Sequence, residues 1–134
     1  MTFNKRLRSI RSETDVTVAL SKIRSDMQEI GLSTYDMTRV MTATSELVRN
    51  ILKYAGHGNL IYAPLSDGGR AGIEVIVQDD GPGIDDVEKA LSDNYSSSGT
   101  LGMGLPGVRR LTDEFELASE VGVGTSVNFK VWVS

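Results

Sequence analysis

The sequence predicts an α+β fold, a two-layer sandwich in which about three helices cover one face of a mixed, mostly antiparallel sheet. Helical periodicity is concentrated over residues 12–55. Two strand pairs joined by glycine-containing turns follow it, at residues 59–78 and 114–133. A chain of 134 residues with 40% hydrophobic side chains is expected to form one domain, 1–134, with a substantial core.

Composition excludes several kinds of function. The formal net charge of −4 argues against a non-specific nucleic-acid binder, which needs a basic face. The absence of cysteine excludes disulfides and thiolate chemistry. No apolar run approaches the roughly 20 residues of a membrane helix, and the N-terminal residues lack the apolar core of a signal peptide. We therefore expect a cytoplasmic protein without nucleic-acid or membrane partners.

The first half of the chain is predicted to form one strand and two helices. Residues 3–11 alternate roughly between apolar and basic side chains, as in an edge strand. Ser12 or Thr14 can cap the first helix, and Gly31 ends it. The apolar positions at helical spacing in this first helix are Val16, Leu20, Ile23, Met27 and Ile30.

The second helix begins after Ser33 and is predicted to end near Ala55. Its apolar stripe is Met37, Val40, Met41, Thr44, Leu47, Val48, Ile51 and Leu52. Glu46 and Asn50 are one turn apart and share a face away from that stripe. Charged residues on such a face are commonly solvated surface. Asparagine is a poor helix former, however, so its presence inside a helix slightly favours a functional role for its amide.

Turn residues divide the second half into short elements. Ser66 to Gly69 is a strong hairpin signal, and Asp85 can cap a short helix. The expected elements are strands at 59–65, 70–78, 114–120 and 125–133, helices at 85–91 and 105–112, and a polar loop at 93–101.

Three common phosphate-binding patterns do not fit. The sequence has no GxxxxGK[ST] pattern and none of the eukaryotic kinase motifs. Gly102, Gly104 and Gly107 satisfy GxGxxG, but they follow a polar loop where a dinucleotide-binding fold needs a buried strand.

Four other segments occur in an order that is specific. Glu46 to Asn50 lies on a helix, Asp79 to Gly83 follows a strand, Gly102 to Leu105 opens a helix, and Gly122 to Thr125 forms a hairpin turn. In this order and context they resemble the N box and the three glycine boxes of the GHKL (Bergerat-fold) ATP-binding family, which includes gyrase, Hsp90, histidine-kinase and MutL domains.

The resemblance implies a role for each segment. Asn50 would bind Mg²⁺ through its amide oxygen, and Glu46 would orient the attacking hydroxyl or accept its proton. Asp79 would accept a hydrogen bond from the adenine amino group, supported by Thr125. The implied ATP-binding residues are Asn50, Asp79, Gly81, Gly83, Ile84, Ser98, Gly99, Thr100, Leu101, Gly102, Met103, Gly104, Leu105 and Thr125. Whether Lys53 or Arg49 contacts the phosphates stays open.

Tyr54 stands where many histidine kinases of the family carry a histidine, and the loop at 93–101 is short. These features and the continuation 104–111 resemble the RsbT-type switch kinases of stressosome modules. The resemblance implies a serine/threonine kinase that uses Mg²⁺ and ATP to phosphorylate a STAS-domain protein and then activates a PP2C-type phosphatase by binding. The alternatives are an RsbW- or SpoIIAB-like anti-sigma factor, which binds a sigma subunit and phosphorylates its antagonist, and a non-catalytic docking module. A homo-oligomer is left open.

Overall fold

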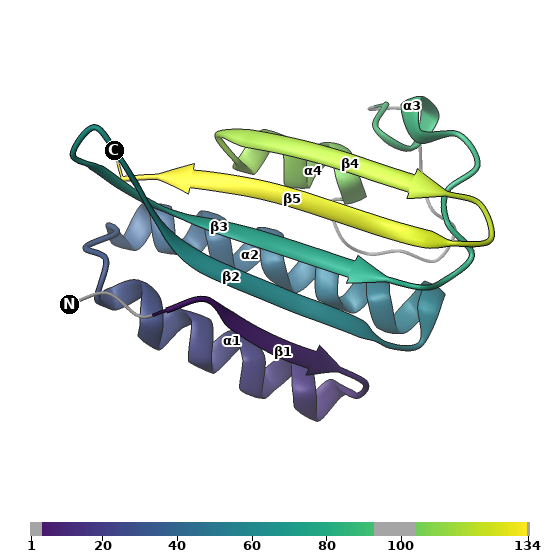
Figure 1. Ribbon diagram of the computed structural model, residues 1–134, viewed down its shortest axis with the longest axis horizontal. Coiled ribbons are helices and arrows are strands. Elements are labelled where there is room, and N and C mark those ends of the chain that lie inside the picture. The colour runs from purple at the N-terminus through teal and green to yellow at the C-terminus, as the bar shows by residue number, and fades with distance from the viewer. Residues whose placement is uncertain (1–3, 93–103, 134) are drawn as a thin grey trace.

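The structure, a computed structural model, describes residues 4–92 and 104–133 and has two layers (Figure 1). One layer is a five-stranded sheet in the order β1-β2-β3-β5-β4. Its strands are β1 (Arg6–Ile10), β2 (Gly58–Asp67), β3 (Arg70–Asp79), β4 (Glu114–Glu120) and β5 (Gly124–Trp132). All four neighbouring pairs are antiparallel. The predicted α+β sandwich is confirmed, with an antiparallel sheet in place of a mixed one.

The helical layer covers one face of the sheet, as Figure 1 shows for α1, α2 and α4. The helical elements are α1 (Glu13–Gln28), α2 (Thr34–Asn50), the π-helical turn η1 (Ile51–Ala55), α3 (Val87–Ala90) and α4 (Gly104–Leu111). The core between the layers is apolar, with Tyr62 and Phe129 among its largest fully buried side chains. None of the helices in the described ranges is long and apolar enough to cross a membrane.

Helix starts follow local side-chain chemistry. The hydroxyl of Ser12 accepts from the backbone N–H of Asp15, and that of Ser33 accepts from Asp36. These caps satisfy amide groups that have no partner within the helix. The predicted Asp85 cap is wrong, because the side chain of Asp86 accepts from the N–H of Lys89 at 3.0 Å. The cap therefore lies one residue later than predicted, and the short helix begins at Val87.

A tyrosine joins α1 to the sheet. The hydroxyl of Tyr62 donates to Asp26 at 2.7 Å, and the same carboxylate lies 3.4 Å from Arg6. Burial and, after it, the hydrogen bond to Asp26 raise the pKa of Tyr62 above its ordinary range. Tyr62 is thus held neutral as part of the core.

The two edges of the sheet carry opposite charges. Strand β1 places Arg6 and Arg8 along one edge, and β4 places Glu114, Glu116 and Glu120 along the other. Charged residues on edge strands oppose pairing with other chains.

One buried hydroxyl gives a test of the packing. Thr44 on α2 is fully buried, and within the described part of the chain its Oγ1 has no hydrogen-bond partner. A buried unpaired polar group costs stability, so Thr44→Val is expected to raise the free energy of unfolding by about 1 kcal/mol. Urea unfolding measures it, with Thr38→Val as the control, because the Thr38 hydroxyl is exposed and donates to the Thr34 carbonyl at 2.8 Å. A lower stability for Thr44→Val would contradict the assignment.

Candidate nucleotide site

A cavity of about 510 Å³ opens at the end of the sheet where β3 ends and β5 begins. Helix α2, the π-helical turn and both short helices contribute to its walls. The lining residues are Leu47, Asn50, Ile51, Tyr54, Ala55, Val77, Asp79, Pro82, Gly83, Ile84, Asp85, Asp86, Lys89, Ala90, Gly104, Leu105, Pro106, Thr125 and Val127. Seven of the predicted ATP-binding residues are among them: Asn50, Asp79, Gly83, Ile84, Gly104, Leu105 and Thr125.

Asp79 lies at the last position of β3, directly opposite Thr125 of β5. Its Oδ1 accepts a hydrogen bond from the N–H of Gly81 at 2.8 Å, which fixes the carboxylate beside the turn. The sheet register therefore places a carboxylate and a hydroxyl together on the cavity wall, an arrangement that can accept hydrogen bonds from an amino group.

Ser119 of β4 organises this end of the cavity and was missed by the sequence predictions. Its Oγ accepts from the N–H of Ile84 at 2.7 Å, donates to the carbonyl of Gly124 at 3.1 Å and lies 2.8 Å from Thr125 Oγ1. A serine hydroxyl has one proton, so donation to Gly124 makes Thr125 the donor to Ser119. The Thr125 oxygen then has lone pairs left as acceptors. The available signal was that Ser119 is the polar residue on the inward face of β4, after Phe115 and Leu117.

Gly81 and Gly83 are required by close packing within the protein. A Cβ at Gly81 would lie 2.6 Å from the Cβ of Ala55. Gly83 has a φ of +79°, and a Cβ there would collide with the carbonyl oxygen of Glu120. The turn after β3 is thereby pressed against η1 on one side and the β4–β5 hairpin on the other. Direct contact of these two glycines with a nucleotide stays a prediction.

Asn50 is the last residue of α2, and the helix widens into the π-helical turn directly after it. Such turns are often found at functional sites. Here the turn carries Ile51, Tyr54 and Ala55 to the cavity wall beside Asn50. The half-buried Asn50 amide can bind a metal or phosphate-bearing ligand in the cavity.

Glu46 lies one turn before Asn50 and faces the start of α4. Its Oε2 is 3.4 Å from the backbone nitrogen of Gly104, the first residue of that helix. A helix N-terminus attracts anions through its free N–H groups and its dipole. In this structure a carboxylate satisfies one of the groups that a phosphate could bind.

The basic side chains considered from the sequence, Lys53 and Arg49, differ from the one that lines the cavity. Lys53 lies over the ring of Tyr54 at 5.2 Å, and Arg49 lies 4.0 Å from Glu13. Neither lines the cavity formed by the described residues, whereas Lys89 of α3 does. Lys89 was not predicted, because nothing in its local sequence distinguishes it from a surface lysine.

Six predicted nucleotide-binding residues lie outside the described residues. They are Ser98, Gly99, Thr100, Leu101, Gly102 and Met103.

The residues that are described fit a magnesium nucleotide. Mg²⁺ is usually held by one or two protein oxygens together with substrate phosphates and water. Asn50 supplies one such oxygen at the cavity wall. Residues 4–92 and 104–133 contain no group of three His, Cys, Asp or Glu side chains placed to hold a metal.

Comparison with known proteins agrees with this geometry. The sequence pattern of a family described as "Histidine kinase-, DNA gyrase B-, and HSP90-like ATPase" matches residues 35–134. The serine/threonine-protein kinase RsbT of Bacillus subtilis is 44% identical over 124 residues, 92% of this chain and 93% of RsbT. An anti-sigma F factor of Halalkalibacterium halodurans is 32% identical over 103 residues, 71% of this chain and 68% of the relative.

A crystal structure of the RsbU and RsbW domains of a Mycobacterium tuberculosis protein shares the fold. It aligns with a TM-score of 0.70 over 96% of this chain and 32% of that chain, at 16% identity. The pattern match and the extent of identity to RsbT identify the family. This chain belongs to the histidine kinase-, DNA gyrase B- and HSP90-like ATPase family, in which it is similar to the serine/threonine-protein kinase RsbT.

Proposed function

We propose that this chain is a cytoplasmic serine/threonine-protein kinase that transfers the γ-phosphate of ATP to a STAS-domain protein. The kinase would then bind and activate a PP2C-type phosphatase. The kinase class is supported by 44% identity to RsbT over 92% of the chain. The observation that carries the proposal is the cavity. Asn50 of α2, Asp79 of β3 and Gly104 of α4 all line it.

The end of the cavity at Asp79 and Thr125 is suited to an adenine ring. Both side chains can accept hydrogen bonds, and the exocyclic amino group of adenine is a donor. The apolar side chains of Ile51, Val77 and Val127 line the same space. They would contact the faces of a planar base and exclude water from it.

The end at Asn50 and Gly104 is suited to phosphates. The amide groups at the start of α4 would donate to phosphate oxygens, and Asn50 would hold Mg²⁺. Bound Mg²⁺ would neutralise the charge that develops during phosphoryl transfer. Glu46, within 3.4 Å of the Gly104 nitrogen, is placed to orient the hydroxyl of a substrate serine or threonine, or to accept its proton.

The second candidate is an anti-sigma factor. It is favoured by anti-sigma F factor relatives at 32% identity, below the 44% of RsbT. The two functions differ in the partner that co-purifies with the protein: a sigma subunit for the anti-sigma factor, and a phosphatase for the switch kinase. A docking module without catalysis would bind partners but transfer no phosphate.

The proposal is tested by incubating the purified protein with radiolabelled Mg-ATP and a purified STAS-domain protein from the same organism. Label is expected on a serine or threonine of the STAS protein. Chelation of Mg²⁺ before the reaction should prevent this labelling. Asn50→Ala should weaken Mg-ATP binding at least about tenfold, because the metal loses a protein ligand. Asn128→Ala, on the outer face of the sheet, is the matched control.

Absence of labelled STAS protein at saturating ATP would overturn the kinase proposal. Unchanged Mg-ATP affinity in Asn50→Ala would overturn the metal role of Asn50 separately.

A further inference from the structure

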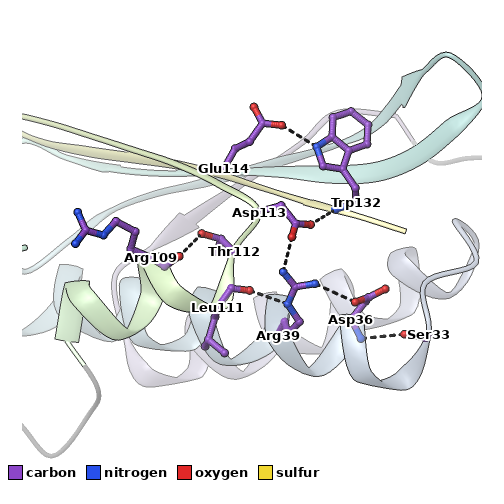
Figure 2. A network of polar contacts seen from close by, with 9 residues as sticks. All are labelled: Ser33, Asp36, Arg39, Arg109, Leu111, Thr112, Asp113, Glu114 and Trp132. Carbon is purple, nitrogen blue, oxygen red and sulfur yellow. Dashed lines mark hydrogen bonds and ion pairs between the residues drawn. The ribbon is translucent and has the colours of Figure 1, made fainter. Parts of the chain in front are cut away.

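Arg39 lies at the opposite end of α4 from the cavity and joins three elements (Figure 2). Its Nε donates to the carbonyl of Leu111, the last residue of α4, at 2.8 Å. Its two terminal nitrogens donate to Asp36 on α2 at 3.0 Å and to Asp113, just before β4, at 2.8 Å. Asp113 also accepts from the backbone N–H of Trp132 in β5 at 2.7 Å. One side chain thereby connects α2, the end of α4 and the sheet.

Two of the three side chains in this ion-pair cluster are largely shielded from water, whereas Asp113 is 34% exposed. The Arg39 side chain is 15% exposed and that of Asp36 is fully buried. Burial alone lowers the pKa of Arg39, but the hydrogen bonds to Asp113 and Asp36 outweigh it and raise the pKa above its ordinary value. The guanidinium donates in three directions at fixed angles, which the single ammonium of a lysine cannot reproduce.

Helix α4 is held against α2 at both of its ends. Arg39 and Glu46 are seven positions apart on α2, and Gly104 and Leu111 are seven apart on α4. Arg39 contacts Leu111 and Glu46 contacts Gly104, so the two helices run antiparallel. A helix of eight residues does not hold its shape or place unaided. Its position is set by these end contacts and by its buried side.

The hydrogen bond from Arg39 to Leu111 is expected to be stronger than the contact between Glu46 and Gly104. A charged donor at 2.8 Å meets a carbonyl at the negative end of the helix dipole. At the other end, the 3.4 Å contact between Glu46 and Gly104 is long for a hydrogen bond. A ligand could therefore replace Glu46 at the start of α4 while Arg39 keeps the helix in place.

We propose that Arg39, together with Asp36 and Asp113, is a positioning residue that sets where the N-terminal amides of α4 meet the phosphates of a bound nucleotide. The inference rests on the nucleotide site of the proposed function. It assigns part of the affinity for the nucleotide phosphates to a cluster that does not line the cavity. Arg39 acts through α4, and its loss shifts the helix along α2.

The experiment compares ATP, ADP and adenosine binding in Arg39→Met, Arg39→Lys and Asp113→Asn, followed by NMR titration well below the unfolding temperature. We expect ATP and ADP to bind about tenfold more weakly in Arg39→Met, because the loss of one hydrogen bond to a charged phosphate changes affinity by about this factor. Adenosine, which lacks phosphates, should change less than about twofold. Arg39→Lys should recover only part of the loss. Arg24→Met, an exposed arginine on α1, is the control.

Equal weakening of all three ligands, or unchanged binding despite a lower melting temperature, would reduce Arg39 to a general stabilising role and overturn the inference. If Arg39→Met does not fold, Asp113→Asn decides, because it keeps the guanidinium and weakens one of its contacts. Failure of the proposed kinase function is seen separately, as absence of label on the STAS protein. Failure of the nucleotide site itself would be seen as absence of ATP binding by the unaltered protein.

Discussion

Glu46→Gln is expected to lower phosphoryl transfer by about 10²- to 10⁴-fold while nucleotide affinity stays nearly unchanged. The amide cannot accept a proton from the substrate hydroxyl, but its oxygen can still accept from the Gly104 N–H, 3.4 Å away in the structure. The geometry at the start of α4 is therefore retained while the base is lost. Single-turnover transfer to the STAS protein, measured beside ATP titration, separates the two effects.

Glu116→Gln is the matched control, because Glu116 is an exposed glutamate on the outer face of β4, away from the cavity. Transfer at the unaltered rate in Glu46→Gln would remove Glu46 from the chemistry. Equal losses of binding and transfer would instead make it a structural cap of α4.

Asp79→Asn is expected to weaken ATP binding about 10- to 100-fold and to remove the preference for adenine. A hydrogen bond to a charged group contributes about 1.5–3 kcal/mol, and each 1.4 kcal/mol is a factor of ten. The asparagine oxygen can still accept from Gly81, as Asp79 Oδ1 does at 2.8 Å. Its NH₂ group would then face the cavity, where it repels the adenine amino group and accommodates the guanine carbonyl.

The measurement is the ratio of ATP to GTP dissociation constants. Asp80→Asn controls for the change in charge, because Asp80 is the exposed neighbour and does not line the cavity. An ATP-to-GTP ratio that Asp79→Asn leaves unchanged would show that this carboxylate does not read the base.

Elements with strong local signals could be predicted from the sequence. Helix α2 begins after Ser33 as expected, and Ser66 to Gly69 forms the expected hairpin turn between β2 and β3. These features depend on periodicity and turn chemistry within a few residues. The helix cap at Asp86 was misassigned, since two adjacent aspartates are equivalent locally and only the path of the chain after the turn distinguishes them.

Contacts between distant segments were beyond local signals. Asp79 and Thr125 could be paired only through the family resemblance, because their proximity depends on the β3–β5 register. Arg39 contacts Leu111 and Asp113, more than 70 positions away. The residues next to Arg39 in the sequence do not distinguish it from other charged residues on a helix. Local sequence signals therefore did not indicate the contacts that hold the candidate site in place.

The opposite charges on the two sheet edges would give a direction to any assembly that forms by pairing of those edges. Two copies joined through β1 would bring Arg6 and Arg8 close to their own counterparts, and joining through β4 would do the same with Glu114 and Glu116. Only unlike edges match, and that head-to-tail contact extends into a filament unless its rotation closes a ring. Asp26 and Lys130 lie against Arg6 and Glu114 within the chain and weaken even this match. Repulsion between like charges therefore disfavours a closed dimer that joins two copies of the same sheet edge.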